Sequence, residues 1–125
     1  MIVVTTNELP GYRIEAVFGR VSGVLVHSRP SANVILPSVS IEMPTFTSFV
    51  ITGQQVATER MAAEATRVGA NAVIAARYSS QQLSEYLVEV VSVGTAVVVS
   101  PIPAGDPGAT TQSGQQAALQ GAPAL

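Results

Sequence analysis

Two strand-like runs open the chain. Residues Ile2–Thr5 are a short apolar run, and a Pro-Gly turn separates them from a longer run, Tyr12–Val26. Every second residue from Ile14 to Phe18 is apolar, a period of two that predicts a half-buried β-strand. Gly19 and Gly23 interrupt this run, and glycine inside a strand marks a bulge or a close backbone approach. We therefore expect a strand that bends at these glycines.

A period of three to four residues follows and predicts a helix. Pro44 suits its first turn, and Gly69 suits its carboxyl-terminal cap. Two starts remain open: a helix over 45–68, or a strand or loop followed by a helix over 53–68, because Thr52 and Gln55 resemble a capping box. The apolar stripe consists of Phe46, Phe49 or Val50, Gly53, Ala57, Met61, Ala65 and Val68.

Two further strands are predicted over Ala72–Tyr78 and Tyr86–Val99, joined by the polar turn Ser79–Ser84. A turn centred near residues 82–83 would place Arg77 opposite Glu89. The element order is β-β-α-β-β. It predicts a two-layer α+β domain in which one long helix packs on one face of an antiparallel sheet.

Composition changes at Pro101. Residues 101–125 are rich in Pro, Gly, Ala and Gln, and Asp106 is their only charged residue. The segment has no aromatic residue and no hydrophobic periodicity, so it is expected to bury too little apolar area to order itself. The chain is therefore predicted to divide into a domain over 1–100 and a flexible tail over 101–125.

Charge and cysteine content exclude several classes of function. Six arginines against eight acidic residues give a net charge of −2, which argues against a nucleic-acid surface. The absence of cysteine excludes disulfides and thiolate metal sites. Charged residues make up 11%, against about 25% in typical soluble domains, which suggests that some surface is buried against other chains. The first residues lack a basic signal-peptide segment and no run could span a bilayer, so a cytoplasmic protein is expected.

His27 and a pair of opposite charges are the candidate chemical groups. His27 is the only histidine, so it is either a metal ligand or base, or a partly exposed residue at a strand end. A closed zinc site needs four ligands, and no metal site or cofactor is predicted within one chain. Arg77 and Glu89 are interpreted as a cross-strand ion pair, or else as a pair that joins two subunits or lines a pocket.

Three segments resemble the YbjQ-like family, often labelled putative heavy-metal-binding domains. They are Val4–Tyr12, Gly69–Val73 and Val93–Val97, and Ser28, Arg29 and Glu42–Pro44 also match positions of its actinobacterial branch. The resemblance implies a small α+β subunit that assembles into a homopentameric ring, with no settled activity. Two departures are visible. The 30–43 loop lacks the family's usual glycine pair, and the first half of the helix, Phe46–Gln55, has no charge.

Together these observations favour a non-catalytic homo-oligomeric module, pentameric by resemblance. One alternative is a protein that binds a small ligand or metal between subunits, with His27, Ser28, Arg29, Arg77 and Glu89 as the candidate binding residues. The other alternative is a small enzyme that uses Arg77 and Glu89 in a cleft.

Overall fold

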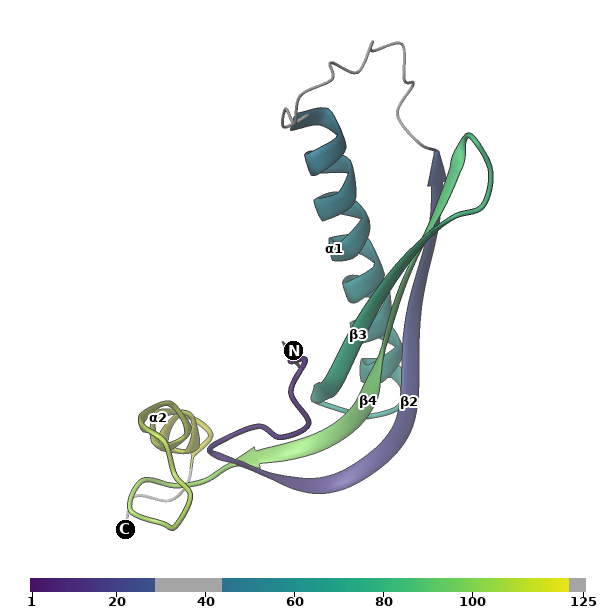
Figure 1. Cartoon of the computed structure of the whole chain (residues 1–125). Helices are drawn as coiled ribbons and strands as arrows, with labels where there is room; N and C mark the ends of the chain where they lie inside the picture. The colour runs from purple at the N-terminus through teal and green to yellow at the C-terminus, as the bar shows by residue number, and fades with distance from the viewer. Residues whose placement is uncertain (29–43, 122–125) are drawn as a thin grey trace.

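A computed structural model describes residues 1–28 and 44–121 of the chain (Figure 1). The elements are β1 (Ile2–Val3), β2 (Tyr12–Ser28), α1 (Pro44–Arg67), β3 (Ala72–Gln82), β4 (Leu87–Pro101) and α2 (Thr111–Leu119). The α+β class is as predicted. The described residues contain two helices where one was expected, and α1 begins close to the earlier of the two predicted starts. The 30–43 loop, with Arg29 and Glu42 beside or within it, lies outside the described residues.

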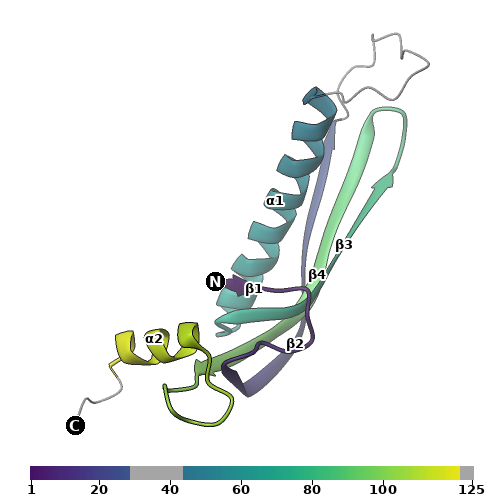
Figure 2. The same ribbon diagram turned by 60° about the vertical axis from the view of Figure 1, so that its left-hand side comes forward.

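The sheet is mixed, which corrects the prediction of an antiparallel sheet. Its strand order is β1-β3-β4-β2, and β1 runs parallel to β3. The Val4 N–H donates to Val73 O at 2.9 Å, and the Ala76 N–H donates to Val4 O at 2.9 Å, which extends this contact beyond β1. The chain start therefore lies beside β3, separate from the long strand β2 (Figure 2).

The long strands β2 and β4 curl together along the molecule (Figure 1). Their antiparallel register shifts twice, between Ile14 and Ala16 and between Val17 and Gly19. Gly19 has a φ of 101°, a conformation that glycine adopts without steric cost. The bulge predicted at this glycine is confirmed. From Arg20 onward the pairing is regular as far as Ser28.

The hairpin of β3 and β4 corrects the predicted pairing of charged residues. β3 continues to Gln82, so the turn lies at residues 83–86, later than expected. A register shift between Ile74 and Arg77 coincides with Ala75, whose φ is 53°. Arg77 lies opposite Val93, and Gln81 lies opposite Glu89. Arg77 and Glu89 are thus not a cross-strand pair. Below, the distal half of the sheet means residues 20–28, 77–82 and 87–95.

Helix α1 packs on β2 and β4 through the predicted stripe. Ala57, Met61 and Ala65 are fully buried, whereas Val68, expected on this face, is 38% exposed. The helix can approach closely because β2 has Gly23 at the crossing point. A Cβ at Gly23 would overlap the Ala57 carbonyl oxygen. Of the two explanations offered for Gly23, a bulge or a close backbone approach, the structure shows the close approach, and the register of β2 does not shift there. This approach fixes where α1 lies on the sheet.

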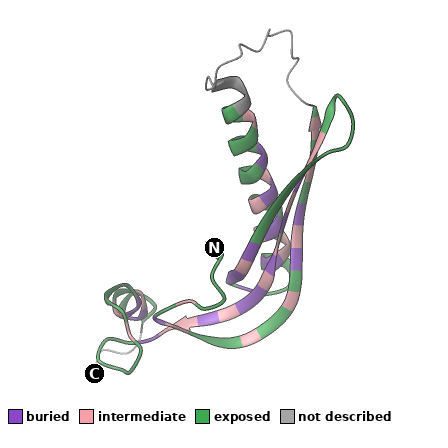
Figure 3. Ribbon diagram, in the orientation of Figure 1, coloured by how far each residue is buried: buried purple, intermediate pink, exposed green. Residues whose placement is uncertain are grey.

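A second core lies on the opposite face of the sheet. It contains Ala72, Ile74, Val97 and Val99, and the partly buried residues packed on it are Ile2, Val4, Leu9 and Tyr12. Successive side chains along β3 and β4 point to opposite faces of the sheet. One set therefore contributes to this second core and the other set to the core under α1, as expected for strands buried on both faces. The curl of β4 and the start of the chain enclose this second core (Figure 3).

Helix α2 was not predicted, because the segment after Pro101 was expected to have no regular element. Thr110 caps it in a reciprocal capping box with Ser113. The Ser113 hydroxyl is buried and donates to Ile102 O at 2.9 Å. Serine replaces the usual Glu or Gln of the box, and small side chains, such as Ala117, face the protein. Short polar residues thus form an ordered element without an apolar stripe.

Candidate functional site

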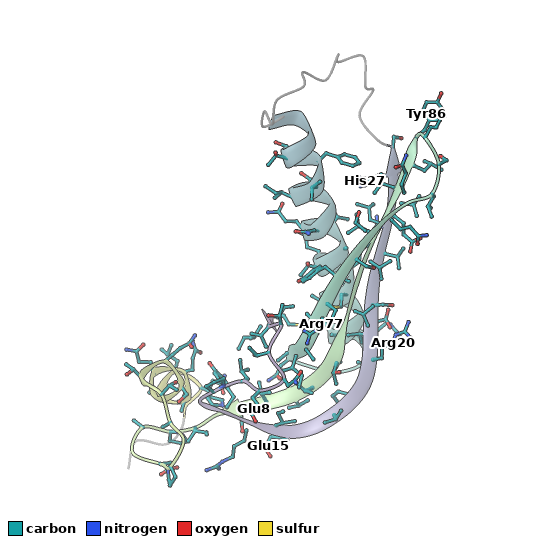
Figure 4. The ribbon with its side chains drawn as sticks, in the orientation of Figure 1. Glu8, Glu15, Arg20, His27, Arg77 and Tyr86 are labelled. Atoms are coloured by element: carbon teal, nitrogen blue, oxygen red, sulfur yellow. The ribbon has the colours of Figure 1, made fainter. Side chains whose placement is uncertain are left out.

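His27 lies near the end of β2, on the face covered by α1 (Figure 4). Its ring stacks on Phe49 with 4.0 Å between centroids and 8° between planes. Gly53, one helical turn further along α1, makes room for the imidazole, because a Cβ there would lie 3.1 Å from His27 Cε1. The Nε2 atom is buried and has no hydrogen-bond partner among the described residues. A buried nitrogen without a partner costs about 1–3 kcal/mol, so this position is chemically notable.

A pocket of about 230 Å³ adjoins the His27–Phe49 stack. Among the described residues, none with a charged side chain lines it. Its lining comes from α1 and from all three strands of the distal half, namely His27, Phe49, Val50, Ser80, Gln82, Val88 and Val90. Such a surface is mostly apolar with a few polar groups, which is typical of sites for small uncharged molecules. We call it the His27 pocket.

Among the other predicted binding residues that the structure describes, Arg77 and Glu89 do not lie at the His27 position of the sheet, and Ser28 follows His27 in β2 with the opposite parity. Ser28 is exposed and lies opposite Leu87, and Arg29 lies outside the described residues. Arg77 donates to Thr5 O at 2.7 Å and to Ala76 O at 2.9 Å. Glu89 lies opposite Val26, so its side chain is on the face that α1 does not cover. The described structure therefore does not bring Arg77, Glu89 and His27 together in one cleft.

A larger hollow lies between α1 and β3. Its volume is about 630 Å³, and it is lined by Ile51, Gln54, Gln55, Thr58, Glu59 and Tyr78. The hydroxyls of Thr58 and Tyr78 lie 3.2 Å apart across it. Amide and hydroxyl groups predominate, with one carboxylate, so the surface offers hydrogen bonds rather than acid–base chemistry. We call it the α1–β3 groove.

Within residues 1–28 and 44–121, no cluster of three or more His, Asp or Glu side chains could hold a metal ion. The only described histidine contacts Phe49 rather than a carboxylate. None of the helices in the described part of the chain is long and apolar enough to cross a bilayer.

Sequence reasoning identified His27 but missed the residues around it. Phe49 was assigned to the helix stripe, and nothing in strand parity indicates that it stacks on a histidine. Ser80 and Gln82 were placed in a turn, although their alternate spacing fits the continuation of β3. One available signal was Gly53, because a glycine in a helix interior costs about 1 kcal/mol and often has a packing reason.

The chain was compared with known protein families and curated proteins. A family model for YbjQ proteins, described as "Putative heavy-metal-binding", matches residues 1–100. A "UPF0145 protein" of Mycobacteroides abscessus is 42% identical over 106 residues, covering 82% of this chain and 99% of that protein. Proteins of the same name from Methanothermobacter thermautotrophicus and Thermotoga maritima are 39% and 36% identical, and the alignments cover 92% and 100% of their lengths.

A solved structure supports the fold. It is a protein of unknown function from Pediococcus pentosaceus that belongs to the DUF74 family. The TM-score is 0.55 at 13% identity, and the match covers 80% of this chain and 98% of that one. At this identity the likeness concerns the fold alone.

Proposed function

The chain belongs to the YbjQ-like family, whose members have no established function, and from this premise we propose that it is a non-catalytic homo-oligomeric module. A pentameric ring is the assembly we propose, with residues 1–100 as the assembling domain and the cytoplasm as its location. No catalytic role is indicated for the family. The separation of Arg77 from Glu89 within one chain also weakens the alternative of an enzyme that uses these two residues in one cleft.

One observation carries this proposal: the distal half of the sheet has a patch of valines, on the face away from α1, that no described element covers. Val24 and Val26 are 45% and 49% exposed on this face. Val91 lies opposite Val24 in β4, so its side chain belongs to the same surface. Exposed apolar patches of this kind mark interaction surfaces. The low charge of the chain, 11%, supports the same conclusion because few charges are available to solvate a monomer.

Light scattering after size exclusion tests the assembly. The expected result is a single species with five times the 12.9-kDa chain mass over a range of concentrations. Val24→Glu, on the exposed face, is expected to lower that mass without unfolding the chain, and Thr111→Glu on the surface of α2 is the matched control. A monomer at every concentration contradicts the proposal, and another closed oligomer corrects only the number of subunits.

A second candidate function is the binding of a small ligand, favoured by the His27 pocket and its buried Nε2 atom. The lining fits a small, uncharged, partly apolar molecule. Titration with phenol or indole, followed by the methyl NMR signals of Val88 and Val90, tests this. Saturable shifts confined to these methyls support the pocket, and the absence of shifts at millimolar probe argues against it.

The family label also suggests a metal test. Calorimetric titration with zinc and copper is expected to give no tight site per chain, because His27 has no second His and no thiolate beside it. A site with one ion per ring, lost in His27→Ala, would place the metal between subunits. One tight site per chain that survives His27→Ala would contradict the ligand arithmetic.

A further inference from the structure

The sheet has two long backbone edges without a strand partner in the described part of the chain. One edge is β2, which pairs only with β4. The other is the distal part of β3: β1 pairs only with Ala72 and Val73, so residues 77–82 pair only with β4. All six of these β3 residues are exposed (Figure 3).

Among the described residues, neither edge is paired with a strand or interrupted by a proline, lysine or bulge in the stretches 20–28 and 77–82. Monomeric proteins blunt exposed edges with proline, lysine, bulges or a covering element. Residues 20–28 and 77–82 contain no proline and no lysine. The bulges of β2 lie before Arg20, and that of β3 lies before Arg77, so both stretches are regular. Each stretch has a single charge of its own, at its first residue. Arg60 of α1 donates to Val24 O at 2.7 Å, so a strand added to β2 must displace the Arg60 side chain at this one carbonyl. The other backbone groups along both stretches can accept another strand.

Helix α1 lies off-centre on the sheet, over β2 and β4 rather than β3. Gly23 of β2 lies under Ala57, and Gly53 lies against Val90 of β4. On β3, by contrast, the α1-facing residues Tyr78 and Ser80 stay exposed beside the α1–β3 groove. A helix is about 10 Å wide and strands are about 4.8 Å apart, so one helix covers about two strands. The distal part of the third strand is therefore only partly covered, with the Thr58–Tyr78 hydroxyl contact at the edge of the α1–β3 groove.

We propose that β2 of a second copy of this chain adds to the β3 edge at residues 77–82, so that the sheet continues from one copy to the next. This inference rests on the proposed homo-oligomer and names its interface. β2 and β3 both run antiparallel to β4, so the added strand lies parallel to β3 when successive copies are related by rotation. The second copy's α1, seated on its own β2 and β4, then flanks the α1–β3 groove.

This contact uses different surfaces on the two partners. Such head-to-tail contacts generate a closed ring when the rotation closes. When each copy adds its β2 to the β3 edge of the next copy around the ring, no β2 or β3 edge stays open. This arrangement therefore removes both edges as sites for uncontrolled strand addition. An isologous contact of β2 with β2 would instead leave the β3 edge exposed in every copy.

Disulfide trapping tests the interface, because the chain contains no cysteine. Ser79→Cys on β3 is combined in turn with a cysteine at Arg20, Ser22, Val24 or Val26 on β2. These residues share the face that α1 does not cover. Within one copy β4 separates the two strands by about 9.6 Å, which exceeds the 4.4–6.8 Å between Cα atoms of a disulfide. Any disulfide in these double variants therefore joins two copies.

The expected result is a ladder of covalent multimers, under oxidation, for at least one of the four pairs. The matched control combines Ser79→Cys with Thr111→Cys, which lies at an exposed residue of α2. The yield of multimers should exceed that of this control by about tenfold or more. Each single variant should give dimers at most. Circular dichroism and light scattering of the reduced proteins verify that the substitutions leave folding and assembly intact.

Hydrogen exchange on the unmodified protein gives an independent reading. Backbone amides of residues 77–82 should be protected in the assembled protein and exchange faster when dilution dissociates it. If the unmodified protein assembles but no pair cross-links above the control and these amides stay unprotected, the interface is wrong and the homo-oligomer stands. If the protein is monomeric at every concentration, the proposed function fails and this interface fails with it.

Discussion

Gly23→Ala tests the position of α1 on the sheet most directly. A methyl group at Gly23 would overlap the Ala57 carbonyl oxygen and lie 2.5 Å from Met61 N and 3.0 Å from Arg60 Cβ. Unstrained carbon contacts are about 3.5–4.0 Å, so the helix must retreat by about 1 Å. Overpacking costs about 1–3 kcal/mol, and we expect the upper end, about 3 kcal/mol, because backbone atoms cannot rotate away.

Urea unfolding at fixed protein concentration measures this cost. With an m value of about 1.5–2 kcal/mol/M, the midpoint should fall by about 1.5–2 M. Gly53→Ala is the matched control at the same interface, since neither glycine has a positive φ. Its Cβ would meet the movable His27 ring at 3.1 Å, and helix propensity offsets the contact, so a change under about 1 kcal/mol is expected. A Gly23→Ala midpoint equal to that of the wild type would refute the close approach of α1.

Three further substitutions, one of them with a control variant, probe other parts of the fold by the same unfolding assay. Met61→Asp buries an unpaired charge at a fully buried position and should abolish folding, whereas Glu59→Gln should be neutral within about 0.5 kcal/mol. Asn71→Asp keeps the acceptor for the Val99 N–H at 2.7 Å but loses the donor to Val99 O at 2.8 Å, and should cost about 1–3 kcal/mol. Ser113→Ala removes the cap partner of α2 and should cost about 1–2 kcal/mol, with faster amide exchange confined to that helix; unchanged exchange would contradict the capping role.

The sequence was informative where one physical requirement governs a residue. The stripe through Ala57, Met61 and Ala65 needs only helical periodicity, and the structure buries all three. For Gly19 and Gly23 the sequence offered two explanations, a bulge or a close backbone approach. The structure shows a bulge at Gly19 and a close approach at Gly23. Element type and the core face of α1 could therefore be predicted from local patterns.

The errors arose where distant segments decide the outcome. A two-residue β1 has no period of its own, so its parallel pairing with β3 is set by the core it helps to cover. The cross-strand partner of Arg77 is decided by the bulge at Ala75 and by the later turn between β3 and β4. These place Arg77 opposite Val93, four residues or about 13 Å along β4 from Glu89. The stacking of His27 on Phe49 joins two elements at a contact that neither pattern encodes.

The antiparallel pairing of β2 with β4 also has a consequence for the order of folding. Ser28 pairs with Leu87, so the whole of α1 and β3 lies in the chain between these strands. The β3–β4 hairpin closes locally, whereas β2 must find β4 across a long loop, which slows folding. Until it does, α1 has no Gly23 to dock against, and the valine-rich β4 is open along one side. We therefore expect the isolated hairpin to be the species most prone to misassembly during refolding, and arrival of β2 to end that vulnerable interval.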